Sequence, residues 1–486
     1  MEEGGKCSEA ERIMTCMWDT PAGKELPAGY FCGTVEEIED DKFRQKLRKY
    51  RRIMMKRRHK VIGMTVLYIM LVVLTGCGKS TENTLQKEVV EVEQEPVSTP
   101  EPTATPEPTP TPFPEYDINL MMVGDNLMHM GIVTTGKQAD GSYNYDFLFE
   151  GIEDFLAEAE VKMINQETIL GGNQLGFSGY PHFNSPTEVG DAIVDAGFNV
   201  VLHSSNHTAD KGLKGILNCV DYWQQYPEVL VAGIDGEETV SDGDNPKEEI
   251  QILEIEGVTF AVLNYAYAPN MGSFPKEYEG HMDMLCDYNP KSRMIDFTTI
   301  REEVLTEIAE ADKLADFVVV CPHWGTEYTT TPSSYQEKFA RQMTEAGADI
   351  IIGTHPHVVQ PVEWVEAENG NKSLCYYSLG NYVSTQKQAL CMLEAMAWVT
   401  IHVDENGPSI DVEKTGVLPL VCHYNAMPVR MESVYLLEDY TEEQAASHGI
   451  KAYGGVDLRL SDLHKWTTEV FEGQVLAADQ ILGTNQ

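Results

Sequence analysis

The chain has 486 residues, of which 42% are hydrophobic and 23% are charged, and its formal net charge is -42. This composition is typical of a soluble globular protein and argues against a polytopic membrane protein. Residues 1–76 contain 14 Lys and Arg against 11 Asp and Glu, so the rest of the chain, with 21 against 66, carries -45. So acidic a surface repels nucleic-acid phosphates, and we expect no nucleic-acid partner. It suits divalent cations.

A lipoprotein signal is predicted over residues 54–77. A basic run, Lys56–Lys60, precedes an apolar segment, Val61–Leu74, which is shorter than the roughly 20 residues of a bilayer-spanning helix. The segment leads into a Leu-Thr-Gly-Cys tetrapeptide ending at Cys77, which resembles a lipobox, so we expect lipid on Cys77. The alternative is a signal anchor that stays in the membrane. In both cases the following residues lie on the outer face of the cell membrane.

Two segments on either side of this signal lack the pattern of a folded domain. Residues 1–53 have mixed charge and no clear periodicity. They are either a disordered cytoplasmic extension or upstream of the true start of translation near Met54 or Met55. Residues 78–116 are rich in Glu and then in Pro and Thr. Such a composition cannot bury a core and favours extended conformations, so it predicts a semi-rigid stalk.

From residue 117 onward, short apolar runs alternate with amphipathic segments, as in a layered α/β domain. We expect this domain to span 117–425 and a β/α appendage to span 426–486. Strands are predicted at residues 118–123, 161–165, 199–203, 229–232, 317–321 and 349–352. Helices are predicted at residues 146–159, 186–196, 212–225, 298–313 and 334–346, and hairpins at 249–267 and 362–377.

Side chains that can bind metal ions follow five of the predicted strands, at the edge where an α/β sheet opens its binding crevice. A lone histidine at such a position is more often structural, but five positions are hard to ascribe to chance. Burying several imidazoles and carboxylates without a counter-ion is costly, and a metal centre removes that cost. The residues are Asp125, Glu167, Asn206 with His207, His323, and His355 with His357.

The types of donor atom indicate which metal to expect. Imidazole, carboxylate and amide donors together suit Mn, Fe or Zn, whereas an all-oxygen set would favour Mg or Ca. Glu167 can bridge two ions and Asn206 can supply a neutral oxygen, so we expect one or two divalent transition-metal ions. Two ions generate a nucleophile from water and bind a phosphoryl oxygen. His207, oriented by Asp210, is then the candidate proton donor to the leaving group.

Two longer motifs are His-Trp-Gly-Thr-Glu-Tyr at 323–328 and Ser-Leu-Gly-Asn-Tyr at 378–382. Together with the strand-end residues, they resemble the CapA or poly-γ-glutamate biosynthesis family, which belongs with the calcineurin-like metallophosphoesterases. The resemblance covers roughly residues 118–419. It implies an α/β sandwich of two mixed sheets flanked by helices, with His207 as the catalytic histidine. It also implies that the metal-binding positions are Asp125, Glu167, Asn206, His323, His355 and His357.

The chain departs from the family's usual residues at Ser204-Ser205, before Asn206, and from the general metallophosphoesterase pattern after Asp125. That pattern begins Asp-x-His, whereas this chain has Leu127 two residues after Asp125. One ligand of the first metal is therefore missing, and His129 has the wrong spacing to replace it simply. Glu327 has two interpretations. It either supports the metal ligands by hydrogen bonding or is a solvated surface charge.

The leading hypothesis is a membrane-anchored, metal-dependent hydrolase of the phosphoesterase type that acts in capsule or poly-γ-glutamate production. One alternative is a non-catalytic accessory subunit that binds metal or the anionic polymer and organises a membrane synthase. Another is a peptidase-like hydrolase that uses the same residues on γ-glutamyl bonds. The expected partners are membrane lipid, polymer-synthase subunits, and an anionic polymer or a phosphoester.

Overall fold

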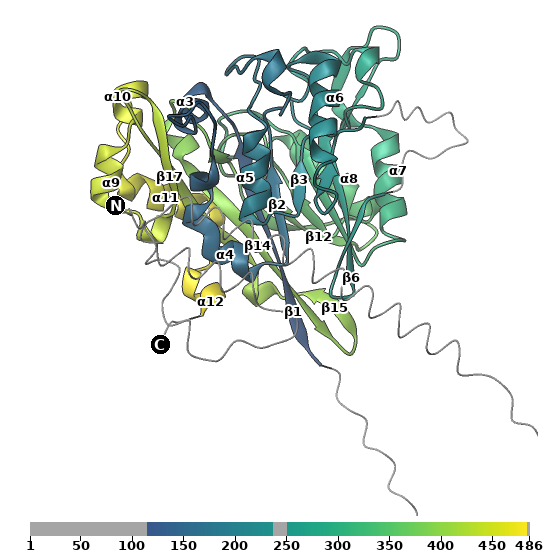
Figure 1. Cartoon of the computed structure of the whole chain (residues 1–486). Helices are drawn as coiled ribbons and strands as arrows, with labels where there is room; N and C mark the ends of the chain where they lie inside the picture. Colours follow the sequence, from purple (N-terminus) through teal and green to yellow (C-terminus); the bar gives the residue numbers. More distant parts are fainter. Residues whose placement is uncertain (1–113, 237–249, 484–486) are drawn as a thin grey trace, which may run out of the picture. The chain divides into compact units, whose positions relative to one another are not determined.

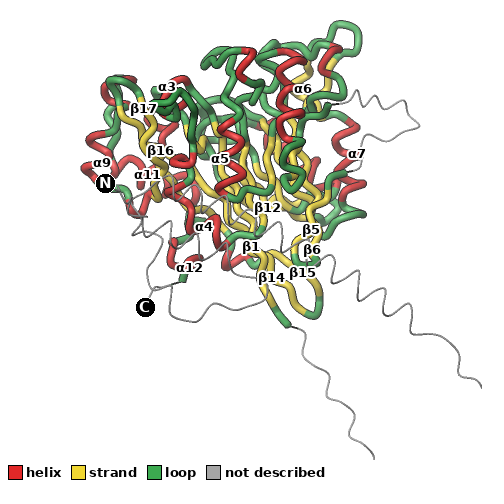
Figure 2. The backbone as a smooth tube through the Cα atoms, viewed as in Figure 1, coloured by secondary structure: helices red, strands yellow, loops and turns green. Residues whose placement is uncertain are grey.

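The computed structural model describes residues 114–236 and 250–483. The predicted signal, Cys77 and almost all of the predicted stalk lie outside the described residues. None of the helices within the described ranges has both the length and the apolar character needed to cross a membrane. Strands and helices alternate through these ranges, and Figure 2 shows that helices flank the strands. The chain therefore has a mixed α/β fold, as the sequence predicted.

The larger of the sheets has nine strands among the described residues (Figure 1). They are β1 (Tyr116–Asn126), β2 (Val161–Asn165), β3 (Val200–Leu202), β4 (Leu230–Ala232), β13 (Asn381–Val383), β14 (Leu393–Asp404), β15 (Gly407–Ile410), β16 (Gly416–Asn425) and β17 (Arg430–Leu436). On one side of β1, the strands β2, β3 and β4 follow in parallel. On the other side, β14, β16 and β17 follow in antiparallel register. The sheet is therefore mixed, and β1 lies at its centre.

The second sheet has six strands in the part of the chain that is described. They are β5 (Ile252–Ile255), β6 (Val258–Ala266), β9 (Phe317–His323), β10 (Ile350–Ile352), β11 (Val362–Glu366) and β12 (Lys372–Tyr376). The strands β6, β9, β10 and β12 run parallel, and β5 and β11 close the two edges as antiparallel hairpins. Both predicted hairpins are thus confirmed. A short ribbon, β7 (Cys286–Tyr288) with β8 (Ile295–Ile300), was not predicted.

Alternate residues of β9 face two different buried layers, because successive side chains of a strand point to opposite faces. Val319 and Cys321 join the core cluster that contains the strands of the larger sheet. Val318 and Val320 join a second cluster, which includes helix residues. The hydroxyl of Tyr376 on β12 also donates across the layers to the carbonyls of Trp398 and Gly416, at 3.2 and 3.1 Å. The smaller sheet therefore packs on the larger one.

Helices cover the outer faces of these layers (Figure 1). They are α3 (Met130–Thr135), α4 (Glu153–Glu158), α5 (Glu188–Ala196), α6 (Gly212–Trp223), α7 (Glu302–Ala311), α8 (Ser334–Ala346), α9 (Glu442–Ser447), α10 (Ile450–Gly454), α11 (Leu460–Phe471) and α12 (Ala478–Leu482). The bounds of α8 match the predicted helix, and a capping box of Ser333 and Gln336 begins it. The helix predicted at 298–313 begins later, because its first residues belong to β8.

The helix predicted at 146–159 is interrupted. Two 3-10 turns, η2 (Asp146–Leu148) and η3 (Glu150–Ile152), precede α4. A Cβ atom on Gly151 would lie 1.9 Å from the carbonyl oxygen of Val434, so the backbone here lies directly against β17. Residues 146–152 therefore form two 3-10 turns against β17, and only Glu153–Glu158 of the predicted helix is α-helical.

Candidate metal centre

The residues predicted as metal ligands lie together at one end of both sheets. The larger sheet supplies Asp125 from the end of β1, Glu167 from the loop after β2, and Asn206 from the loop after β3. The smaller sheet supplies the others from β9 and from the loop after β10. Three groups of described side chains have ligand atoms within 4.8 Å of one another, namely Glu167, His323 and His355; Asp125, Glu167 and His357; and Glu327, His355 and His357.

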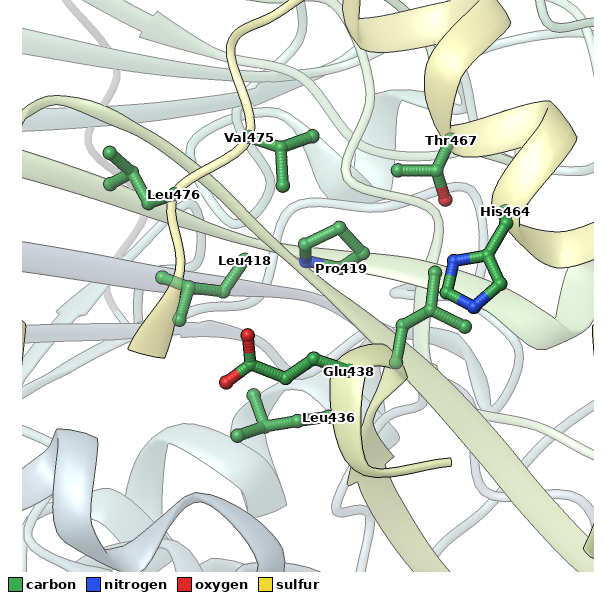
Figure 3. Close-up of a pocket in the computed structure, with 9 residues that line it drawn as sticks. Leu418, Pro419, Leu436, Glu438, His464, Thr467, Val475 and Leu476 are labelled. Carbon is green, nitrogen blue, oxygen red and sulfur yellow. The ribbon is translucent and has the colours of Figure 1, made fainter. Parts of the chain in front are cut away.

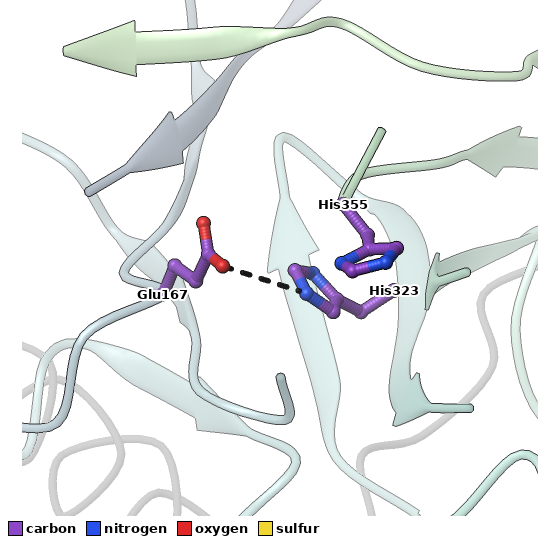
Figure 4. A group of neighbouring side chains, drawn as sticks. All are labelled: Glu167, His323 and His355. Carbon is purple, nitrogen blue, oxygen red and sulfur yellow. Dashed lines mark ion pairs between the residues drawn. The ribbon is translucent and has the colours of Figure 1, made fainter. Parts of the chain in front are cut away.

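Glu167 lies between the histidines of the smaller sheet. Its Oε1 is 3.8 Å from Nε2 of His323 (Figure 4) and 3.9 Å from Nε2 of His207. Its Oε2 is 3.8 Å from Nδ1 of His357. Both oxygens are buried and have no hydrogen-bond partner among the described residues. Burial and the neighbouring Asp125 carboxylate raise the pKa of Glu167, and the charge of His357 does not outweigh them.

Asp125 is held in place from several directions. Its Oδ1 accepts a hydrogen bond from Nδ2 of Asn165 at 2.7 Å. Its Oδ2 accepts from Nδ1 of His357 at 3.1 Å and from the backbone N–H of His355 at 3.3 Å. Burial lowers the pKa of His357, but the charges of Glu167 and Asp125 outweigh it and raise that pKa to about 9. His357 therefore carries the positive charge that partly balances the two carboxylates.

His323 and His355 are neutral imidazoles, the form that binds metal ions. Burial, aided by the neighbouring histidines, lowers the pKa of both. Nδ1 of His323 lies 2.9 Å from Oγ1 of Thr354, and its Nε2 lies 2.8 Å from Oδ1 of Asn206. Nδ1 of His355 is buried without a hydrogen-bond partner in the described structure. Thr354 therefore orients the His323 ring, and the side-chain oxygen of Asn206 lies beside Nε2 of the same ring.

His207 is oriented by its neighbours so that its second nitrogen faces the centre. Its Nδ1 lies 2.7 Å from Oδ2 of Asp210 and 3.0 Å from Nδ2 of Asn270. The backbone N–H of Phe183 donates to the same Asp210 oxygen at 2.7 Å. The Phe183 and His207 rings meet edge to face, with 4.6 Å between their centroids. Nε2 therefore points toward Glu167. Asp210 therefore orients His207, and the role of His207 as a proton donor stays a prediction.

The loop after β10 has a strained backbone. His355 has φ 95° and His357 has φ 58°, and both values lie in the left-handed region that residues other than glycine rarely adopt. Such strain concentrates at functional sites, where the surrounding structure enforces it. Here it turns both imidazoles inward from either side of a single proline.

Sequence reasoning did not assign a role to several polar residues around the centre. Asn381 accepts from Nδ1 of His357 at 3.1 Å, and it belongs to the motif at 378–382. Asn165 and Asn270 follow or end strands, so the strand-end signal used for the other residues also applied to them. Glu394 is buried, and both its oxygens lack a hydrogen-bond partner among the described residues. It lies within a long apolar strand, where no local signal marks it.

An apolar pocket lies elsewhere in the fold (Figure 3). Leu418, Pro419, Leu436 and Leu476 are among the residues that line it, with Glu438, His464 and Thr467 as the polar ones. None of the candidate ligands contributes to its walls. This pocket therefore has no share in the chemistry of the candidate metal centre.

The fold and these side chains define a mixed α/β protein with a buried centre of histidines and carboxylates that can hold a metal ion. Residues 119–386, more than half of the chain, match the family described as "Bacterial capsule synthesis protein PGA_cap". The chain belongs to this family, which confirms the resemblance seen in the motifs.

Two relatives support the same assignment. The chain is 28% identical over 322 residues to "PGA biosynthesis protein CapA" of Bacillus subtilis (strain 168), covering 65% of this chain and 75% of the relative. It is 29% identical over 304 residues to "Capsule biosynthesis protein CapA" of Bacillus anthracis, covering 60% and 66%. A solved structure, a hypothetical protein from Thermus thermophilus, aligns with a TM-score of 0.34 at 12% identity, covering 62% of this chain and 99% of that one.

Proposed function

We propose that this chain is a metal-dependent hydrolase of the phosphoesterase type that acts in capsule or poly-γ-glutamate production. The names of the two CapA relatives support the process. The observation that carries the hydrolase part is Glu167, whose two buried oxygens face histidines on both sides without any hydrogen-bond partner among the described residues. Glu167 would therefore be a ligand for metal ions at this centre, and these would supply an activated water for hydrolysis.

The side chains at the centre fit divalent metal ions. Buried polar atoms without partners are costly, and Glu167 and His355 supply three such atoms. The mixed donors suit Mn, Fe or Zn. Asp125, Glu167 and His357 are the side chains for one ion. The side chains for the other are Glu167, Asn206, His323 and His355.

When bound, such ions supply a nucleophile at neutral pH and stabilise negative charge on phosphoryl oxygens. The protein's own part in the reaction falls to His207 and Asp210. Asp210 holds the proton on Nδ1 of His207 and stabilises the charged ring, so Nε2 can donate a proton to the leaving oxygen. The burial of these side chains excludes bulk water and strengthens each electrostatic interaction. We also propose that the two packed sheets form a metallophosphoesterase-like sandwich. The order in which the candidate ligands follow successive strands supports this assignment.

The proposal includes attachment to the outer face of the cell membrane and assembly with subunits of a polymer synthase. The apolar segment ending at Cys77 and the Pro-rich stretch that follows it support attachment by lipid. The acidic composition of the remaining chain suits a surface-exposed protein that does not bind nucleic acid.

A second candidate function is a non-catalytic accessory subunit that binds metal or the anionic polymer. Leu127 favours it, because a histidine stands at this position in the general metallophosphoesterase pattern. Without that ligand, one ion is held by fewer donors. In the accessory role the centre only helps to organise the membrane synthase. This role therefore predicts that the protein hydrolyses no substrate and that cells still produce polymer.

The deciding experiment combines hydrolysis with polymer production. The purified protein is loaded with Mn, Fe or Zn and assayed on phosphomonoesters, phosphodiesters and γ-glutamyl polymers. Surface polymer is measured in cells that carry wild-type protein or His207→Ala. Phosphoester turnover and reduced polymer in the variant strain support the hydrolase. Inactivity with every metal and substrate, together with normal polymer in the variant strain, contradicts it, and turnover of γ-glutamyl polymer alone redirects the assignment to a peptidase-like hydrolase.

A further inference from the structure

The two halves of the candidate centre have unequal numbers of donors. The half that contains His323 has four side chains, because Asn206 adds its oxygen beside the histidine. The half that contains Asp125 has three, because Leu127 is a buried hydrocarbon. His129 does not fill the gap, since none of the three groups of ligand atoms includes it. A donor from another part of the chain would restore the balance.

Glu327 is positioned to supply this donor. It lies in the loop after β9, and its carboxylate is within 4.8 Å of nitrogens of both His355 and His357. Its negative charge acts on two members of the deficient half, His357 and Glu167. Glu327 is exposed to solvent, whereas these neighbours are buried. It therefore approaches the centre from its open side.

The backbone holds this loop against the loop after β10. The N–H of Tyr328 donates to the carbonyl of Pro356 at 2.8 Å, between the two histidines. Tyr328 has φ 63°, a conformation that residues other than glycine adopt at a cost. Gly325 has φ 94°, and a Cβ there would lie 2.7 Å from the side chain of Gln336. A merely solvated surface carboxylate needs neither the strained residue nor the tie to Pro356.

Unpartnered buried atoms lie on the residues beside Glu327 and point to a ligand in the centre. Nδ1 of His355 and both carboxylate oxygens of Glu167 are buried without hydrogen-bond partners in the described residues. A hydrogen-bonding role for Glu327 toward the histidines would leave the Glu167 oxygens unexplained. Cations between these grouped ligand atoms would satisfy them, and Glu327 groups with His355 and His357.

We propose that Glu327 is a metal ligand, which supplies from the opposite loop the donor that the chain lacks at position 127. Its ligand atoms group with those of His355 and His357, so it adds a donor on the His357 side of the centre. The inference rests on the metal centre of the proposed function but does not depend on hydrolysis.

The test is a titration of the metal-free full chain with Mn²⁺ alone, read by calorimetry and by electron paramagnetic resonance. Glu327→Gln keeps the size of the side chain and removes its charge. The matched control is Glu345→Gln. Glu345 is an exposed glutamate near the end of α8. It lies before β10, whereas the candidate ligands follow the end of that strand. Circular dichroism of the metal-free proteins checks that each variant is folded.

The wild type should bind two Mn²⁺ per chain and show the spectrum of a coupled pair. Glu327→Gln should keep one ion at unchanged affinity and bind the second at least 10- to 100-fold more weakly, since loss of even an indirect partner of a metal ligand has an effect of about that size. Glu345→Gln should match the wild type. The same weakening in Glu327→Ala supports the inference further.

Three results would overturn the inference. The first is that Glu327→Gln binds both ions with unchanged affinity. The second is that Glu327→Gln weakens both ions equally, which indicates a general electrostatic effect. The third is that the wild type binds no more than one ion. By contrast, a wild type that binds two ions and hydrolyses no substrate removes the proposed hydrolase function and leaves Glu327 as a ligand. Failure of the two proposals is therefore distinguishable.

Discussion

Nε2 of His323 lies 3.8 Å from Oε1 of Glu167, although His323 ends a strand of the smaller sheet and Glu167 follows a strand of the larger one (Figure 4). This distance is too long for a hydrogen bond, and both side chains are completely buried. Folding thus holds a carboxylate and a neutral imidazole apart by about the space that an ion between them requires.

Removing a histidine from this group should lower metal occupancy. His323→Ala and His355→Ala each remove a candidate donor, so we expect metal affinity to fall by at least 10- to 100-fold. Elemental analysis after dialysis against dilute chelator measures the change. His464→Ala, which removes an exposed histidine outside the centre, should keep wild-type occupancy. Full metal content in the first two variants would show that the ligand assignment is wrong.

Loss of the proton donor should slow turnover without emptying the centre. His207→Ala should lower phosphoester turnover by about a hundredfold or more, the usual scale for a general acid, while metal content stays close to wild type. The decrease should be smaller for aryl phosphates with good leaving groups, which need little protonation. Steady-state kinetics on an alkyl and an aryl phosphate measure this difference. An equal decrease for both would contradict the role in leaving-group protonation.

Gly124→Ala should disturb the centre through the backbone. An added Cβ would lie 2.0 Å from the carbonyl oxygen of Gly380, which accepts a hydrogen bond from the Asp125 N–H. Neither backbone segment can yield easily, so we expect a loss of about 1–3 kcal/mol in unfolding free energy and weaker metal binding. Urea denaturation and metal titration test this, with Ser409→Ala on the exposed face of β15 as control. A variant as stable as wild type would show that the strands separate freely.

Buried neutral histidines outside the centre should make stability fall in mild acid. Burial lowers the pKa of His203 to about 3 and that of His448 to about 4, whereas both titrate near 6.5 when unfolded. Because the unfolded state takes up these protons first, the stability contribution is complete above pH 6.5 and is lost as pH falls toward those values. Each histidine should contribute about 1.4 kcal/mol per pH unit in this range.

The contribution of His203 can be isolated by substitution. Nε1 of Trp223 donates to Nε2 of His203 at 2.7 Å, and the amide oxygen of His203→Gln can accept a similar bond. We expect this variant to lose less stability than the wild type between pH 6.5 and 5.5, as measured by urea denaturation of the metal-free protein. His464→Gln should keep the wild-type slope, and a wild-type slope in His203→Gln would refute the assignment.

The lipid anchor can be tested on the mature protein. We expect mass spectrometry of its N-terminal peptide to find diacylglycerol on Cys77, because a single acyl chain holds a protein only weakly at a membrane. Cys77→Ala should release the protein from the membrane fraction or leave its signal uncleaved. An unmodified cysteine in a chain that retains its apolar segment would establish a signal anchor instead.

Local sequence patterns were enough to predict the α/β class, the bounds of α8 and the strands that carry the candidate ligands. Apolar periodicity and capping residues act over a few positions, so these features can be read without knowledge of the fold. The positions of Asp125, Glu167 and His323 at strand ends were readable for the same reason. The strands β14 and β16 were missed because their buried runs lack the alternation that marks a half-exposed strand.

Which of these residues meet depends on the tertiary structure. The approach of His357 to Asp125 follows from how the smaller sheet packs on the larger one, and that of Glu327 to both loop histidines follows from the parallel pairing of β9 with β10. Residues far apart in sequence make that contact, so no local pattern records it. Glu394 was hidden for a related reason, because only packing on all sides distinguishes a buried carboxyl from an exposed one. Local propensity therefore placed each candidate ligand on its strand, and the packing of the two sheets brought the ligands into one centre.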